Sequence, residues 1–500
     1  MKSLKWGFIP TAEGGTLAWL EEYQALLVNA FVDIESTGFP FDPMVHQRFI
    51  ERANVVYAEY EARLRKNSSL VRYCEKAGKA VEDFKFGSSQ QLSAFLYGSK
   101  SEGALGLDTS KVSKSKITGK PSTDKYAIGY FAEQGNRFCQ DLLVLKNFST
   151  MLSSFGESLL KFYCEETGAV HPSYFLAKVV DGTGKYGGTA SGRLSCARPN
   201  LQQLSKRDKG DSNVGMSGVE VRRSFVPRKG EVLVEIDQSQ VEVRVAGMYA
   251  KDKQMGKFFD MGGDFHTRVA SMVSGRDYDE MLAIMDDVDH PKHGEVKKLR
   301  SSAKQITFGL LYGMGIPKLI KECGMKKEEG EEFIQTYFGI FPELAAWRNK
   351  TIDDALRTGE AHTLFGRVRQ LRIGNKISRD KREERIGVNT PIQSAASDIV
   401  LYALAVIWWE LRSKGYVTRI IGTIHDSIIF SVPVEELNVV LPWVVKFMTN
   451  PPGLEWLLED SPIRLAVSVD MGLNFKDMYE VPIAVIESGK IEEEHYAFRD

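Results

Sequence analysis

Two aspartates stand at the ends of apolar runs, where paired carboxylates can hold metal ions. Asp237 follows the run EVLVEI, and Asp426 lies in a polar turn between RIIGTI and SIIFSVP. Burying carboxylates at the ends of two adjacent strands is costly unless cations neutralise them. Two Mg²⁺ ions about 4 Å apart would do so and would leave room for phosphate and water. Together the pair predicts metal-assisted chemistry, whereas each aspartate alone is more typical of an ordinary turn.

A regular stripe of cations and aromatic rings lies between these aspartates in the sequence. It consists of Arg300, Lys304, Phe308 and Tyr312, each four residues after the last. This spacing keeps the side chains on one face of a helix, with a slow drift. Cations at one end could hold a triphosphate, while rings at the other stack on a base. Solvated cations and core aromatics show the same spacing, so the stripe alone does not identify a site.

The elements that must position these residues follow from the periodicity of apolar side chains. Residues 229–236 predict a short buried strand, and residues 240–250 resume helical spacing. Residues 417–433 predict a hairpin of two β-branched runs around a polar pair. Residues 44–66 predict one long amphipathic helix, and residues 255–400 are mostly helical. A strand, then helices, then a hairpin indicate an α+β fold in which a sheet supports a helical insertion.

The overall composition narrows the class of protein. A chain of 500 residues, 43% of them hydrophobic, is long enough for two to four domains. It has no run of about 18 apolar residues and no basic-then-apolar leader, so we expect neither a membrane span nor an export signal. Five scattered cysteines without a C-x-x-C pair indicate a reduced intracellular compartment and no zinc module. The net charge of −1 does not exclude a polyanion partner, because binding responds to a local basic groove.

The segment VDIESTG at residues 32–38 raises the possibility of a nuclease. A strand-like Val-Asp-Ile-Glu resembles the opening of DnaQ-like 3'→5' exonucleases, in which Asp33 and Glu35 would hold metal ions. Such sites need further aspartates, the last usually preceded four positions earlier by Tyr or His. No aspartate up to residue 190 has that neighbour. We therefore interpret Asp33 and Glu35 as structural. The motif MDDVDHPKHGE at 285–295 has a passable metal-ligand spacing, but a solvated loop is the favoured interpretation.

Five motifs in order resemble those of family A (DNA polymerase I-like) DNA polymerases. EIDQSQVEVR, RSSAKQITFGLLYG and IHDS resemble motifs A, B and C of that family. TASGRLSCARPNLQQL and NTPIQSAASD resemble its T-x-x-G-R-L-S…P-N-L-Q segment and its N-x-P-x-Q-x-x-A-x-D helix. ESTGFPFD resembles the start of the polymerase domain. The resemblance implies a right-hand polymerase without proofreading or 5'-nuclease domains.

The resemblance also implies a role for each motif residue. Asp237 and Asp426, with the backbone carbonyl of Gln238, would hold two Mg²⁺ ions, with Mn²⁺ as an alternative. Lys304 would protonate the leaving pyrophosphate, and Glu242 would crowd a ribose 2'-hydroxyl. The expected nucleotide-binding residues are His266, Arg300, Lys304, Phe308, Tyr312, Glu242 and Gln240. The expected DNA-binding residues are Arg193, Arg207, Arg385, Asn389, Gln393 and His425.

Two positions depart from the family pattern. Most members read His-Asp-Glu in motif C, whereas this chain reads His-Asp-Ser, with Ser427 in third place. A hydroxyl does not carry a carboxylate's charge, so we expect reduced or retuned activity from a site that keeps both aspartates. Gln238 stands where Tyr is frequent, and a contact through its backbone carbonyl should survive that change.

The prediction is a template-directed DNA polymerase of α+β, right-hand fold, with a palm sheet and helical thumb and fingers. The expected division is an N-terminal segment at 1–29, thumb at 30–205, palm at 206–250, fingers at 251–400, and palm with an acidic tail at 401–500. Expected partners are primer-template DNA, deoxynucleoside triphosphates, and a separate proofreading exonuclease, helicase/primase or processivity factor, without a membrane. The expected location is the cytoplasm. Alternatives are a single-subunit RNA polymerase and a non-catalytic nucleic-acid-binding remnant.

Overall fold

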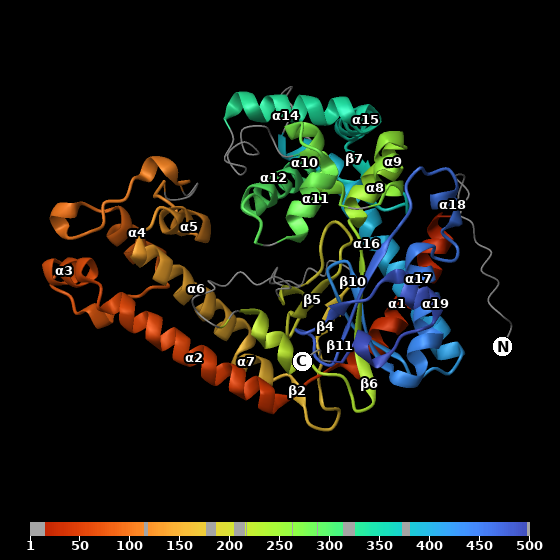
Figure 1. Cartoon of the computed structure of the whole chain (residues 1–500), viewed down its shortest axis with the longest axis horizontal. Helices are drawn as coiled ribbons and strands as arrows, with labels where there is room; N and C mark the ends of the chain where they lie inside the picture. Colours follow the sequence, from red (N-terminus) through yellow and green to blue (C-terminus); the bar gives the residue numbers. More distant parts are fainter. Residues whose placement is uncertain are drawn as a thin grey trace.

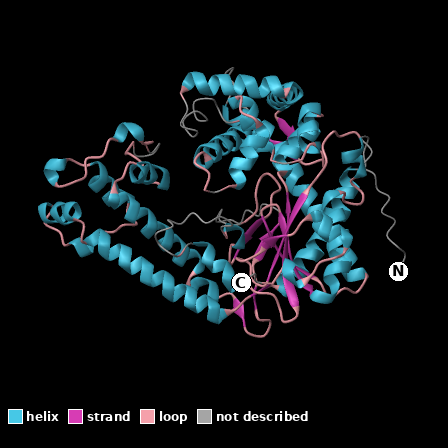
Figure 2. Ribbon diagram, in the orientation of Figure 1, coloured by secondary structure: helices cyan, strands magenta, loops and turns pink. Residues whose placement is uncertain are grey.

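A five-stranded antiparallel sheet lies at the centre of the chain (Figure 2). The computed structural model describes residues 16–114, 119–176, 187–204, 216, 218–262, 264–287, 289–313, 326–372 and 381–497. The strand order is β12 (Tyr479–Glu480), β11 (Val467–Gly472), β6 (Glu231–Gln238), β10 (Ser427–Pro433) and β9 (Arg419–Ile424). The expected strand and hairpin are confirmed as β6, β9 and β10, whereas the pairing of β11 with β6 was not expected.

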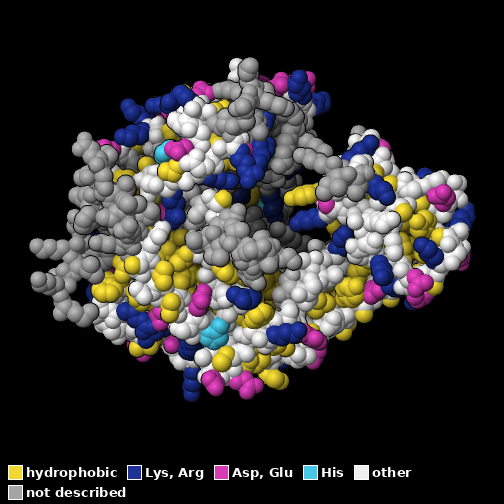
Figure 3. Space-filling model, turned by 180° about the vertical axis from the view of Figure 1, so that it is seen from behind, with side chains coloured by type: hydrophobic (Ala, Val, Ile, Leu, Met, Phe, Trp, Pro, Cys, Tyr) yellow, Lys and Arg dark blue, Asp and Glu magenta, His cyan; other side chains and the backbone are white. Residues whose placement is uncertain are grey.

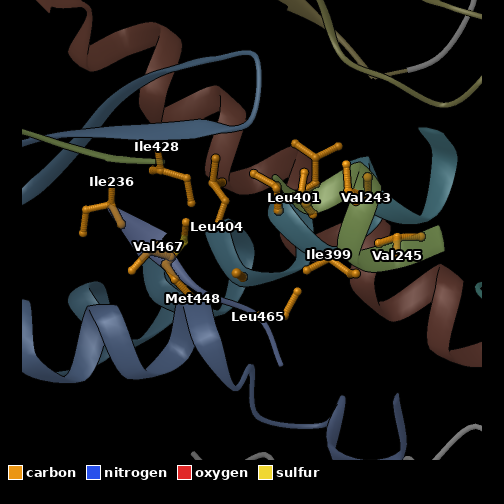
Figure 4. Close-up of a cluster of buried hydrophobic side chains, with 14 of the residues drawn as sticks. Ile236, Val243, Val245, Ile399, Leu401, Leu404, Ile428, Met448, Leu465 and Val467 are labelled. Carbon is orange, nitrogen blue, oxygen red and sulfur yellow. The ribbon is translucent and has the colours of Figure 1, made fainter. Parts of the chain in front are cut away.

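Successive side chains of a strand point to opposite faces of the sheet. Both faces of this sheet are buried, each in a separate hydrophobic cluster. On one face, Ile236, Ile428 and Val467 come from three neighbouring strands and contact the apolar side chains of helices (Figure 4). On the other face, Leu233 packs in a second cluster with Phe225 and Phe475. Asp237 shares this second face, so its position follows from the strand's alternation.

Helix α16 (Lys381–Ser413) is the main core helix of this half of the molecule. It packs against α1 (Thr16–Thr37), α8 (Val241–Ala250) and α17 (Leu437–Thr449). Within the described ranges, α16 is the one helix long and apolar enough to cross a membrane, and 78% of its apolar window is buried inside the protein. Burial of this extent is typical of a core helix in a folded domain.

An elongated arm of helices extends away from the sheet (Figure 1). Its shaft is formed by α2 (Pro43–Arg65) and α6 (Arg137–Phe155), which pack side by side. Its far end carries α3 (Ser68–Lys76), α4 (Ser89–Tyr97) and α5 (Lys125–Glu133). Helix α2 begins where Asp42 caps two backbone N–H groups just before Pro43, which confirms the long helix predicted over 44–66.

A block of helices lies above the central sheet in the view of Figure 1. It contains α9 (Lys253–Asp260), α10 (Phe265–Ser274), α11 (Tyr278–Asp286), α12 (His293–Leu311), α14 (Lys327–Ile340) and α15 (Pro342–Thr358). The small hairpin of β7 (Glu360–His362) and β8 (Val368–Gln370), which was not expected, follows α15. The space-filling view shows a hollow between this block and the arm, with Lys and Arg side chains along its rim (Figure 3).

Short elements join these parts. The described ones are β1 (Phe39–Pro40), α7 (Glu157–Leu160), β2 (Tyr163–Cys164), β3 (Ala169–Val170), β4 (Ser173–Phe175), β5 (Ser195–Ala197), α18 (Glu455–Glu459) and α19 (Ile483–Ser488). The strands among them pair as β1-β3-β2 and as β4-β5. The pairing of β4 with β5 brings the segment that follows Gly187 back toward the central sheet.

Candidate active site

The two aspartates predicted to act together lie at adjacent strand ends. Asp237 occupies the last but one position of β6, and Asp426 lies in the two-residue turn between β9 and β10. The backbone N–H of Gln238 donates to the carbonyl of Asp426 at 3.1 Å, which fixes the turn against the end of β6. His425 completes the turn with a φ of 56°. The adjacency expected from the sequence is present, and the role of the carboxylates as metal ligands stays a prediction.

The donors at this edge fit a hard divalent cation. Burial raises the pKa of Asp426, although Arg193 and His425 act in the opposite direction. A carboxylate with a raised pKa has less neutralising charge around it than its burial demands. Among the described residues, no group of three or more His, Cys, Asp or Glu side chains could hold a metal. An ion bound here would therefore draw further oxygen ligands from backbone carbonyls, water or phosphate, as Mg²⁺ commonly does.

Glu242 connects three separate segments beside the aspartates. Its carboxylate accepts hydrogen bonds from the Arg193 guanidinium on one oxygen and from the Tyr312 hydroxyl on the other. Glu242 lies on α8, Arg193 in the segment before β5, and Tyr312 at the end of α12. Burial, and then the charge of Asp426, raise the pKa of Glu242 to about 8. Sequence reasoning placed these three residues in the site but did not foresee the bonds among them.

Helix α16 holds the segment that carries Arg193. The Ser394 hydroxyl donates to the backbone carbonyl of Ser191. Arg367 donates three hydrogen bonds to the fully buried Asp398 of α16, at 2.8 to 3.1 Å, and packs against Gly192. Gly192 has a φ of +77°, and a Cβ there would meet the Arg367 side chain. A buried ion pair therefore sets the backbone that presents Arg193.

The basic stripe lies on α12 and faces α10. Arg300 forms an ion pair with Asp264, which also accepts from the backbone N–H of His266 at 3.0 Å. Lys304 lies 5.8 Å from the ring centre of Phe308, and the rings of Phe308 and His266 are 5.6 Å apart. Helix α12 ends at Leu311, so Tyr312 follows the last helical residue and does not lie within the helix. The sequence did not reveal that Arg300 has a protein partner.

His266 is buried under the stripe with unsatisfied ring atoms. Its side chain is 1% exposed, and neither ring nitrogen has a hydrogen-bond partner among the described residues. Burial lowers its pKa to about 4, with Asp264 opposing this shift and Lys304 and Arg300 adding to it. His266 is therefore neutral at pH 7. Because buried polar atoms are rarely left unpaired, these nitrogens mark a place for a ligand or water.

The remaining predicted residues lie around this centre. Arg385, Asn389 and Gln393 share one face of α16, and Arg385 packs over Gly313 at the end of α12. Gln240 precedes α8 with a φ of 55°. The buried side-chain oxygens of Gln240 and Asn389 have no hydrogen-bond partner in the described part of the chain. The predicted DNA contact at Arg207 lies outside the described residues.

The residues that suggested a nuclease lie elsewhere and make structural contacts. Asp33 and Glu35 belong to helix α1, so the segment Val-Asp-Ile-Glu, which resembles a strand in sequence, is helical. Asp33 pairs with Arg412 and accepts from the Trp408 indole at 2.8 Å, which ties α1 to α16. Glu35 accepts from the backbone N–H of Tyr174 at 2.5 Å. Packing of α1 on α16 overrides the strand preference of Val and Ile.

Comparisons with known proteins agree with the motif assignments. The family model of DNA polymerase family A matches residues 56–477. The thermostable DNA polymerase I of Thermus aquaticus is 28% identical over 438 residues, which are 87% of this chain and 46% of that protein. DNA polymerase I of Pseudomonas aeruginosa is 29% identical over 80% of this chain and 39% of that protein. The chain thus spans about half the length of the relatives it matches.

A solved structure shares the fold. The POL domain of Pol1 from M. smegmatis, in complex with DNA primer-template and dNTP, superimposes with a TM-score of 0.72 at 24% identity. The match covers 92% of this chain and 71% of the other. Because the family model covers well over half of the sequence, and its motifs surround one site, the chain belongs to DNA polymerase family A.

Proposed function

We propose that this chain is a template-directed DNA polymerase that adds deoxynucleoside triphosphates to a primer 3' end. The observation that carries the proposal is the placing of Asp237 and Asp426 at adjacent strand ends, with Glu242 and the α12 stripe close by. Membership of family A supports it, as does the likeness to a polymerase domain in complex with primer-template and dNTP. The reaction needs positioning and charge stabilisation more than it needs a protein base.

The metal ions of this reaction would be held by the acidic end of the sheet. Asp237, Asp426 and the backbone carbonyl of Gln238 are the residues in position to hold them, with Mg²⁺ as the expected ion and Mn²⁺ as the alternative. Two such ions lower the pKa of an attacking hydroxyl and stabilise a leaving pyrophosphate. The chain's part is to fix the two carboxylates through the strand ladder before any substrate arrives.

The triphosphate would lie along α12. Arg300 and Lys304 would supply positive charge, and Lys304 would give a proton to pyrophosphate. His266 contributes hydrogen bonding and not charge, because a pKa of about 4 keeps its ring neutral at pH 7. Arg300 must loosen its pairing with Asp264 to hold a phosphate with its full charge. Phe308 would pack on the sugar and base of the nucleotide.

Glu242 would select deoxynucleotides. Arg193 and Tyr312 hold its carboxylate from two sides, so the side chain has little freedom to move away from a 2'-hydroxyl. A fixed group that clashes with one competitor and not the other gives discrimination without tighter binding. This feature favours a DNA polymerase over the single-subunit RNA polymerase alternative.

The arm would act as the thumb, the central sheet as the palm and the upper helices as the fingers, with boundaries as expected from the sequence. Arg193, Arg207, Arg385, Asn389, Gln393 and His425 would line the DNA. Contacts of this kind read the shape of a base pair more than its sequence. A cytoplasmic location completes the proposal, supported by the bacterial relatives.

Primer extension tests the proposal. A 5'-labelled primer-template with Mg²⁺ is offered deoxynucleotides, ribonucleotides or no nucleotide, using wild type, Asp426→Ala and the exposed control Asp279→Ala. We expect extension with deoxynucleotides by wild type and the control, and none by Asp426→Ala. Equal use of ribonucleotides would instead support an RNA polymerase. Binding of DNA without extension would support a non-catalytic remnant, and a primer that shortens without nucleotide would support a nuclease.

A further inference from the structure

The position that departs from the family in motif C has a buried acidic neighbour. Ser427 begins β10 directly opposite Asp237 of β6, and it is 1% exposed. Its hydroxyl oxygen lies 3.0 Å from a carboxylate oxygen of Glu235 and 2.8 Å from the carbonyl of Ile424. Glu235 precedes Asp237 by two residues, so both side chains point to the same face of β6. A third carboxylate therefore lies on the face of β6 that carries Asp237, two residues before it, and belongs to β6 instead of β10.

Glu235 is held by a cation from outside the sheet. Its second oxygen lies 3.3 Å from the Arg222 guanidinium, and both side chains are at most 4% exposed. Arg222 also donates to the carbonyl of Phe475 at 3.1 Å and lies 3.6 Å from the centre of that ring. Asp470 stands opposite Glu235 on β11. The cluster thus joins β6, β10 and β11 directly beneath the strand ends of the site.

The residues at 235 and 427 fit each other as a pair. A glutamate at 427 would bring a second carboxylate against that of Glu235, in a place where both are removed from water. Arg222 has one positive charge and cannot neutralise both. Burial of an unpaired charge costs several kcal/mol, so the chain has room for one of these acids and not for two. The small Ser427 side chain leaves space for Glu235 and donates a hydrogen bond to it.

We propose that Glu235 is a positioning residue that takes over the place of the missing motif C glutamate. Both oxygens of its carboxylate are engaged by Ser427 and Arg222, so its role is to position the strands and not to ligate a metal directly. Bonded to Ser427 on one side and Arg222 on the other, it fixes β6 to β10 next to Asp237 and Asp426. It thereby sets the spacing of the two carboxylates. The inference rests on the proposed function, in which those carboxylates hold metal ions.

The same strands contain a matched control. Glu231 bonds the hydroxyl of Ser431 in the way that Glu235 bonds Ser427, each serine facing the residue two positions after its glutamate. The second pair lies four residues away, about 13 Å along the strand. A purely structural brace between β6 and β10 would be weakened by changing either glutamate, without an effect on metal binding that is specific to Glu235.

The test compares Glu235→Gln with Glu231→Gln in the full chain. Mn²⁺ binding is measured by electron paramagnetic resonance without DNA or nucleotide, together with the unfolding midpoint without metal. We expect both changes to lower the midpoint, but only Glu235→Gln to weaken Mn²⁺ binding, by about 10-fold or more, as is usual for groups that orient metal ligands. Equal Mn²⁺ affinity in the two variants overturns the proposal.

A second test moves the glutamate from position 235 to position 427. Ser427→Glu alone and Glu235→Ser alone should each weaken Mn²⁺ binding, whereas the double variant Glu235→Ser/Ser427→Glu should bind more tightly than either. A double variant that binds Mn²⁺ no more tightly than the single variants contradicts the pairing.

The variant Asp426→Ala distinguishes a failure of this proposal from a failure of the proposed metal site. If wild type binds Mn²⁺ and Asp426→Ala does not, a failure of Glu235→Gln concerns this proposal alone. If wild type binds none, the proposed metal site fails and this inference fails with it.

Discussion

The charged side chains at the acidic end of the sheet and on the basic face of α12 are held in position in different ways. Asp237 and Asp426 are placed by backbone pairing, through the β6–β10 ladder and the 3.1 Å bond from Gln238. Arg300 is instead placed by another side chain, the carboxylate of Asp264. In the proposed function the acids would be in place before substrate binds, whereas Arg300 would have to exchange Asp264 for a phosphate. Preorganised charge of the first kind costs no rearrangement at the moment of reaction.

Removing the charge of one of the two aspartates should have the largest effect on the rate of primer extension. In Asp237→Asn the size of the side chain is kept and its charge is lost, so we expect primer extension to slow on the order of a thousandfold, or about 4 kcal/mol. Single-turnover extension measures this, with Asp279→Asn as the exposed control. A rate within tenfold of wild type would mean that the acidic end of the sheet is not the reaction centre.

Substitutions of Arg300 on α12 and of its partner Asp264 should have intermediate effects, and should change the KM for deoxynucleotides in different directions. Arg300→Ala removes a charge-assisted phosphate contact, and we expect the KM for deoxynucleotides to rise about 10- to 100-fold. Asp264→Asn keeps an oxygen that caps α10 but frees Arg300, so its KM should equal or fall below that of wild type. Steady-state kinetics at saturating DNA distinguish the two. A rise in KM for both variants would show that the intact pair is needed and that no exchange occurs.

Glu242 should make stability depend on pH, by a few degrees. Burial raises its pKa to about 8 from an ordinary value of 4.5, so the folded state keeps a proton that the unfolded state loses. The stability it contributes is fully present below about pH 4.5 and is lost as pH rises to about 8. We expect the unfolding midpoint of wild type to fall relative to Glu242→Gln over this interval, and to stay level above it. Parallel curves across that range would contradict the raised pKa.

The smallest effect is expected at Asp33. Asp33→Ala removes the ion pair to Arg412 and the bond to Trp408, which should lower the free energy of unfolding by about 1 kcal/mol, because the pair is partly exposed. The rate of primer extension should not change. Chemical denaturation and the extension assay measure the two quantities. A loss of activity without a loss of stability would assign Asp33 a chemical role after all.

Elements with a local sequence pattern could be predicted, whereas elements that depend on contacts between distant segments could not. Strand β6, the β9–β10 hairpin and helix α2 were predictable, because alternation, β-branched runs and helical spacing are written within a few residues. Strand β11 was not, since it pairs with β6 across more than two hundred residues. The strand-like sequence Val-Asp-Ile-Glu is helical for a related reason, because packing on α16 decides that segment.

The site shows the same division. Motif spacing was enough to select Asp237, Asp426, Glu242 and the stripe, since each motif is short and contiguous. The partners of these residues lie in other motifs: Asp264 for Arg300, Arg193 and Tyr312 for Glu242, Glu235 for Ser427. Ser427 was expected to reduce or retune the activity. Its burial against Glu235 shows that the loss of one acid can be judged only together with the neighbouring strand.

Incorporation of a single nucleotide opposite a defined template base tests the central claim most directly. Four primer-templates that differ only in the templating base are each offered the four deoxynucleotides separately, with wild type and Asp237→Asn. We predict that wild type adds only the complementary nucleotide on each template, and that Asp237→Asn adds none in the same time. Addition that ignores the template base, or that persists in Asp237→Asn, would contradict a template-directed polymerase centred on this aspartate.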